Sequence, residues 1–188
     1  MEFDGNLKDL GEIDAQALID RVLSLPEEKW AANQYRQNAY SVHEHTESLV
    51  MVFCNGWPDM TVSKESAWDD LHDIAVPLMQ GILADHYPAG GTILRAMVAK
   101  LKPGGVISPH RDTHESFVVS HRIHVPITTN PGVRFMINGR PHRFEIGHAY
   151  EINNQRNHSV MNTGREDRMT FIFDYLPPKQ EGAAATVQ

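Results

Sequence analysis

The pattern of hydrophobic and polar positions divides the chain into two parts. Before residue 92, apolar residues recur at helical spacing over residues 14–25 and again after Ser66, which we expect to cap the second helix. Pro77 lies inside this second segment and predicts a kink or a break. Between the two segments, the apolar run Ser48–Cys54 is typical of a buried strand. The first part is therefore predicted to contain two helices and a strand.

From Thr92 onward the pattern changes to short apolar stretches separated by turn residues. Asn138-Gly139 predicts a hairpin because both residues accept positive φ, and Asn130-Pro-Gly132 and Asn162-Thr-Gly164 predict further turns. The strands predicted here are Thr92–Leu101, Val106–Pro109, Phe117–Ile127, Val133–Ile137, Arg140–Ile146, His148–Ile152, His158–Asn162 and Arg168–Tyr175. Strands at this spacing favour a sandwich or barrel over β-α-β units.

Composition and charge are those of a globular protein and argue against several kinds of partner. The length of 188 residues suits a single domain, expected over residues 1–178 with a β core at 92–176, followed by a disordered tail at 179–188. A net charge of −7 argues against a nucleic-acid surface, and no apolar run approaches the ~20 residues of a membrane helix. Cys54 is the only cysteine, which excludes an internal disulfide and favours a cytoplasmic location.

The clearest chemical pattern follows a Pro-Gly-Gly turn at residues 103–105. His110 and Asp112 are two positions apart, so their side chains point to the same face of an extended strand. His158, at the start of a later predicted strand, offers a third ligand. Two histidines and one carboxylate form the facial triad that holds Fe(II) in non-haem oxygenases. Exposed polar residues at a strand end, with a histidine on a loop, are the alternative interpretation.

Arg168 adds a second element to this pattern. It follows His158 by ten residues across a predicted turn. If the two strands pair antiparallel, Arg168 lies within roughly 7 Å of the level of His158. A buried guanidinium requires an anionic partner, and a dicarboxylate cosubstrate would supply one through paired hydrogen bonds. A surface arginine, or an ion pair with Glu166 or Asp167, is the alternative interpretation.

Three segments together resemble the aspartyl/asparaginyl β-hydroxylase family. They read G-G-V-I-S-P-H-R-D from Gly104, H-R-I-H-V-P-I-T-T-N from His121, and G-H-A-Y-E-I-N-N from Gly147 with the N-H-S-V-x-N-x-G-x-x-D-R that follows. The family consists of Fe(II)- and 2-oxoglutarate-dependent oxygenases. The resemblance covers about Arg95 to Tyr175. It implies a mostly β fold with flanking helices around a double-stranded β-helix (jelly-roll, cupin-like) core.

The resemblance also implies roles for individual residues. His110 and His158 match the family's metal-binding histidines. Arg168 matches the arginine that holds the far carboxylate of 2-oxoglutarate. Arg122 and His124 share one face of a predicted strand and match a pair that reaches the other end of this cosubstrate.

At two positions the chain departs from the best-known member, the vertebrate peptidyl hydroxylase. Asp112 is a carboxylate ligand that this enzyme lacks, so the chain is closer to bacterial members with a complete triad, which include hydroxylases of free amino acids such as proline. Ala99 aligns with a serine that helps to bind 2-oxoglutarate in the vertebrate enzyme. That contact must therefore be replaced or lost.

The sequence thus predicts an Fe(II)- and 2-oxoglutarate-dependent dioxygenase that uses O2 to hydroxylate an unactivated C–H bond of an amino acid, free or in a peptide, and releases succinate and CO2. The catalytic metal ligands would be His110, Asp112 and His158, and the cosubstrate would contact Arg168, Arg122 and His124. Two alternatives stay open. One is a cupin-like carboxylate-binding protein without activity, and the other is a Zn²⁺-dependent hydrolase or isomerase with the same ligands.

Other aromatic and polar residues have weaker signals. Residues that could recognise the substrate are Trp30, Tyr35, Arg36, His43, His45 and Trp57, but a place in the core or on the surface is the favoured interpretation for each. Four further histidines are interpreted as surface residues or as groups beside the site, namely His114, His121, His142 and His148.

Overall fold

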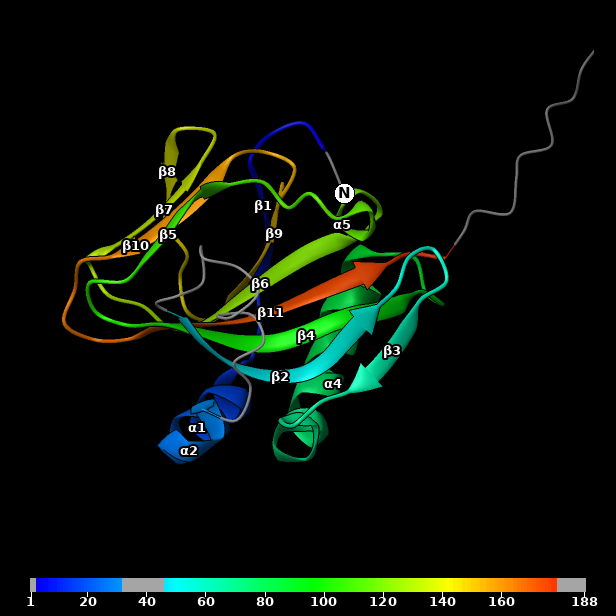
Figure 1. The fold of residues 1–188 in the computed structure, drawn as a ribbon, viewed down its shortest axis with the longest axis horizontal. Helices are drawn as coiled ribbons and strands as arrows, with labels where there is room; N and C mark the ends of the chain where they lie inside the picture. Colours follow the sequence, from blue (N-terminus) through cyan, green and yellow to red (C-terminus); the bar gives the residue numbers. More distant parts are fainter. Residues whose placement is uncertain (1–2, 32–45, 179–188) are drawn as a thin grey trace, which may run out of the picture.

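The computed structural model describes residues 3–31 and 46–178, and its main feature is a pair of antiparallel sheets (Figure 1). The larger sheet has the strand order β1-β9-β6-β11-β4-β2-β3, and the smaller has the order β5-β10-β7-β8. In Figure 1 the smaller sheet lies at the upper left, and helices α1, α2 and α4 lie below, on the opposite side of the larger sheet. The predicted sandwich or barrel of short strands is therefore what the chain forms.

The strands have the following bounds. The larger sheet contains β1 (Leu7–Glu12), β2 (Thr46–Asn55), β3 (Thr61–Lys64), β4 (Thr92–Leu101), β6 (His121–Thr128), β9 (His148–Ile152) and β11 (Arg168–Leu176). The smaller sheet contains β5 (Val106–His110), β7 (Val133–Ile137), β8 (Arg140–His142) and β10 (His158–Asn162).

The helices cover the outer face of the larger sheet and bury its apolar side. These helices are α1 (Gln16–Ser24), α2 (Glu27–Ala31) and α4 (Trp68–His86). The short helix α5 (Glu115–Val119) instead borders the space between the two sheets, where Phe117 lies. Leu18 of α1 and Leu71 of α4 are fully buried in one core with Val98 and Phe171 of the sheet. No helix in the described ranges is both long enough and apolar enough to cross a membrane.

Strand alternation sends polar side chains into the space between the two sheets. Val125 of β6 and Phe171 of β11 belong to the core under the helices, so the residues next to them face the smaller sheet. The inward-facing residues of these two strands that line the cavity there are Arg122, His124, Arg168, Ile172 and Asp174. Alternation thus settles the orientation of Arg122 and His124.

Two of the predicted strands are shorter than expected. The segment predicted as the strand Phe117–Ile127 is divided into helix α5 and strand β6. His114 is the N-cap of this helix, and its ring nitrogen Nδ1 accepts a hydrogen bond from the Ser116 amide. The predicted strand Arg140–Ile146 pairs only over Arg140–His142. Beyond this short hairpin, Phe144 leaves the sheet and stacks on other aromatic rings.

Helix α4 also differs from its prediction. Its N-cap is Ala67 instead of Ser66, and no side chain caps it. The amide of Ala67 instead donates to the carbonyl of Val50 in β2, and the amide of Trp68 donates to the carbonyl of Glu65 in a local turn, so these bonds replace the serine cap. The helix continues unbroken through Pro77. The predicted disordered tail, residues 179–188, lies outside the described residues.

Candidate active site

His110, Asp112 and His158 lie together at one end of the space between the sheets. Their ligand atoms are all within 4.8 Å of one another, and no other group of this kind occurs in the described residues. His110 ends β5 and is the direct cross-strand partner of His158, the first residue of β10. The two imidazole centroids are 4.4 Å apart. The structure therefore brings together the three residues that the sequence singled out.

Hydrogen bonds set the tautomer of both imidazoles. Nδ1 of His110 lies 2.7 Å from the carbonyl of Ser108, and Nδ1 of His158 lies 3.0 Å from the carbonyl of Arg156. Because a carbonyl can only accept, each Nδ1 carries a hydrogen, which leaves each Nε2 as the nitrogen that can bind a metal. Burial lowers the pKa of His158, which favours the neutral form that a metal binds. Two imidazoles beside one carboxylate fit Fe(II).

Arg122 forms an ion pair with Asp112, the carboxylate of this triad. One Nη donates to Oδ2 of Asp112 over 2.5 Å, while Nε and the other Nη donate to the two oxygens of Asp174 over 2.7 and 2.9 Å. Oδ1 of Asp112 lies 3.9 Å from Nε2 of His110. Arg122 therefore fixes which carboxylate oxygen faces the histidines.

Asp174 is buried and binds the guanidinium groups of both Arg122 and Arg95. Burial would raise the pKa of Asp174, but the charges of Arg122 and Arg95 lower it overall. Arg95 also donates to Ser116 over 3.0 Å. The ring of Phe117 lies against both guanidinium groups, with centroid distances of 4.4 Å to Arg95 and 4.3 Å to Arg122. These contacts explain why this segment forms helix α5 instead of extending the strand.

His124 is a buried imidazole with no partner. Neither ring nitrogen has a hydrogen-bond partner among the described residues. Burial lowers its pKa far below the ordinary value, and the nearby charges of Arg168 and Arg122 act in the same direction. A neutral buried imidazole without a hydrogen bond is costly, so a ligand in the cavity is its natural partner.

Arg168 is also buried without a counterion. It is only 5% exposed and forms no ion pair or hydrogen bond with any residue in the described ranges. Burial lowers its pKa to about 10, so the guanidinium is charged at neutral pH. The predicted alternatives, a surface position or an ion pair with Glu166 or Asp167, are therefore wrong.

The predicted pairing of the strands that carry Arg168 and His158 is also wrong. Strand β10 pairs with β5 and β7, whereas β11 pairs with β4 and β6. The two residues belong to opposite sheets and approach across the space between them. Phe135 connects them, since its ring stacks on His158 and lies 5.7 Å from the Arg168 guanidinium carbon.

A cavity of about 530 Å³ joins all these groups. The triad lines it together with Arg122, His124 and Arg168, and Met97, Ile107 and Ile172 add apolar surface. Its size is that of a small-molecule site. The segment Phe53–Gly56 at the end of β2 also lines the cavity, and sequence analysis did not identify it because the segment has no ionisable side chain other than a cysteine.

The weaker candidates take different places. His114 lines the cavity, whereas His121 is hydrogen-bonded to Glu151 and lies outside it. Trp30 is buried beneath Lys100. Tyr35, Arg36, His43 and His45 lie outside the described residues, and Trp57 follows the segment on the cavity rim.

Comparison with solved structures shows a similar fold in several oxygenases and hydroxylases. An oxidoreductase of the 2OG-Fe(II) oxygenase family from Burkholderia pseudomallei is 14% identical with a TM-score of 0.60, over 85% of this chain and 76% of that one. A non-heme monooxygenase, ThoJ, in a nickel complex is 13% identical with a TM-score of 0.57, over 93% and 74%. A viral collagen prolyl hydroxylase from Paramecium Bursaria Chlorella virus-1 is 10% identical with a TM-score of 0.53, over 94% and 98%.

These similarities confirm the predicted fold class, a mostly β protein with a jelly-roll core. No curated protein matches the sequence significantly. The family model described as aspartyl/asparaginyl β-hydroxylase matches residues 14–178, which is most of the chain. The chain therefore belongs to the aspartyl/asparaginyl β-hydroxylase family of 2-oxoglutarate- and Fe(II)-dependent oxygenases.

Proposed function

We propose that the protein hydroxylates an unactivated C–H bond of an amino acid, free or within a peptide, with 2-oxoglutarate as cosubstrate and release of succinate and CO2. One observation carries this proposal. A facial triad and a buried arginine with no counterion in residues 3–31 and 46–178 line the same cavity. A triad alone would fit many metal enzymes, but the unpaired cation requires an anionic ligand in the same space.

Each residue then has a defined task. His110, Asp112 and His158 would hold Fe(II), which supplies the oxygen chemistry when it is bound. Arg168 would bind the far carboxylate of 2-oxoglutarate through its planar guanidinium. His124 would donate a hydrogen bond to the cosubstrate, which would give a partner to one of its ring nitrogens.

Arg122 has a contact that the resemblance did not imply. It holds Asp112 and Asp174 at the same time, so its first task is to position the metal-binding carboxylate. A guanidinium has five N–H groups, and the contacts to the two aspartates use three of them. Arg122 also lines the cavity, which leaves the predicted contact with 2-oxoglutarate available to the remaining N–H groups.

The apolar walls serve the chemistry as well. Met97, Ile107 and Ile172 surround the polar groups, and α5 lies beside the triad with Phe117 at the cavity wall. An enclosed site of low polarity strengthens the ionic contacts to the cosubstrate and excludes water from the reaction.

Succinate release tests the proposal. Protein loaded with Fe(II) is incubated with 2-oxoglutarate, O2 and a panel of amino acids and peptides that includes proline, aspartate and asparagine. Wild type should release succinate above the level without substrate for at least one panel member. Asp112→Ala should reduce this rate at least about a hundredfold, because the metal loses its only carboxylate. Binding of 2-oxoglutarate with no turnover on any substrate would instead support a carboxylate-binding protein.

A further inference from the structure

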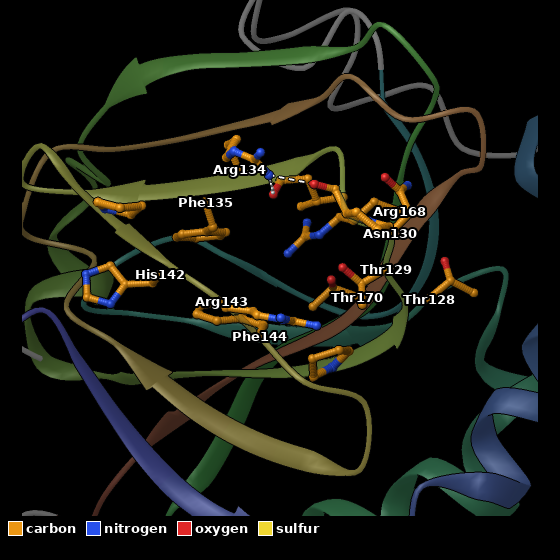
Figure 2. Close-up of a pocket in the computed structure, with 14 residues that line it drawn as sticks. Thr128, Thr129, Asn130, Arg134, Phe135, His142, Arg143, Phe144, Arg168 and Thr170 are labelled. Carbon is orange, nitrogen blue, oxygen red and sulfur yellow. Dashed lines mark hydrogen bonds between the residues drawn. The ribbon is translucent and has the colours of Figure 1, made fainter.

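A second cavity lies on the far side of Arg168, and its volume is about 610 Å³ (Figure 2). It is formed by the segment after β6, by β7, and by the segment that joins β8 to β9. None of the three metal ligands lines it. Arg168 and Phe135 line both cavities and so form the wall between them. This second cavity is therefore a separate space that shares one cation with the catalytic one.

The charge of this cavity is opposite to that of the protein. Arg134, Arg143 and Arg168 line it, and no aspartate or glutamate does. The chain as a whole has a net charge of −7. None of the three arginines forms an ion pair with an acidic residue in the part of the chain that the structure describes. Three cations gathered without an anion raise the local potential and attract anionic ligands.

Two buried groups face this cavity without a partner. Arg168 is 5% exposed, and Thr170, two residues further along β11, is 1% exposed with a hydroxyl that bonds to no described residue. Figure 2 shows the guanidinium groups of Arg168 and Arg143 extending into the cavity with Thr170 between them. Arg134 is oriented by hydrogen bonds of 2.6 and 3.0 Å to the carbonyls of Pro131 and Val133.

We infer that this second cavity binds a small, multiply charged oxyanion. Arginine forks match the planar or tetrahedral oxygens of carboxylates, phosphates and sulfates, and the threonine hydroxyl can donate to the same group. The volume is within the range of small-ligand sites, about 300 to 1,000 Å³. The stacked rings of Phe135 and Phe144, whose centroids are 4.6 Å apart, give the cavity an apolar wall.

The shared arginine makes this site inhibitory. An oxyanion in the second cavity draws the Arg168 guanidinium toward itself, and 2-oxoglutarate requires the same guanidinium from the other side. The two ligands therefore weaken each other, and by linkage the effect is reciprocal. This coupling depends on the proposed function of Arg168, whereas the oxyanion site itself does not.

The test is calorimetric titration of metal-loaded protein with propane-1,2,3-tricarboxylate and, separately, with inorganic sulfate, at constant ionic strength. Arg143→Gln removes a cavity cation, and the matched control Arg140→Gln removes an exposed arginine of β8 outside both cavities. At least one probe should bind to wild type, about tenfold more weakly to Arg143→Gln, and within twofold of wild type to Arg140→Gln. The bound probe should raise the apparent Kd for 2-oxoglutarate in wild type and in Arg140→Gln, and less in Arg143→Gln.

Failure of this inference differs from failure of the proposed function. If 2-oxoglutarate binds but neither probe does, or if the two variants lose affinity equally, the second site is refuted and the hydroxylase proposal is unaffected. If a probe binds with the predicted dependence on Arg143 while 2-oxoglutarate does not bind at all, the oxyanion site is supported and the proposed function fails.

Discussion

Replacing Arg168 by methionine should stabilise the ligand-free protein and at the same time abolish 2-oxoglutarate binding. The guanidinium is buried without an anion, so its removal ends a desolvation cost and leaves a side chain that fits beside Phe135. We expect the free energy of unfolding to rise by about 1–3 kcal/mol. The Kd for 2-oxoglutarate should increase at least about a hundredfold, because the distal carboxylate loses its cation. Urea denaturation and calorimetry measure the two effects.

Arg95→Met is the matched control for this prediction. Arg95 is equally buried, but it has Asp174 and Ser116 as partners. Its removal should lower the free energy of unfolding by about 3 kcal/mol, because it breaks a buried ion pair. If Arg168→Met destabilised the protein as much as Arg95→Met does, Arg168 would have a structural partner in the ligand-free protein. Its proposed role as an unpaired cation that binds an anionic ligand would then be contradicted.

Asp174→Asn should destabilise the protein and also weaken metal binding. Two guanidinium groups, those of Arg122 and Arg95, lose their shared carboxylate, which should cost about 3–5 kcal/mol of unfolding free energy. Arg122 is then no longer held against Asp112, and the metal affinity should fall about 10- to 100-fold, as for other residues that orient a ligand. Competition with a chelator measures the affinity, and urea denaturation measures the stability.

Glu151→Gln is the control that separates the loss of stability from the loss of metal affinity expected for Asp174→Asn. Glu151 is as buried as Asp174 and is paired with His121 and Lys8, but it lies outside the catalytic cavity. Its variant should lose stability while its metal affinity stays within about twofold of wild type. An equal loss of metal affinity in both variants would show that general destabilisation weakens the site, and that Asp174 has no positioning role.

The triad could be predicted from the sequence because its geometry is local. Residues only two positions apart stay close wherever the chain is placed, and Asp112, which lies two residues past the end of β5, is held beside His110 by Arg122. His158 required more, because the structure brings it to His110 by pairing β10 with β5, and the resemblance had implied only that both histidines bind the metal. The place of β11 in the opposite sheet depends on which strands bury their apolar faces under the helices. The spacing of residues along the chain does not show which strands these are.

The contacts of Arg122 with Asp112 and Asp174 show why the rest of the site was not predicted from the sequence. The resemblance implied a contact with the cosubstrate, but the contact with Asp112 exists only in a chain that has this carboxylate. A signal for Asp174 was present in the sequence. Asp174 is six residues after Arg168, and so on the same face of β11, in a strand that is otherwise apolar. A buried acid on that face indicates a buried cation beside it. The structure shows two such cations, Arg122 and Arg95.

The most direct test of the account is an anaerobic crystal structure of the protein with Mn²⁺, a redox-stable substitute for Fe(II), and 2-oxoglutarate. Anomalous scattering should show one metal bound by His110, Asp112 and His158, with the far carboxylate of 2-oxoglutarate against Arg168. A metal bound elsewhere, or 2-oxoglutarate bound without contact to Arg168, would contradict the account.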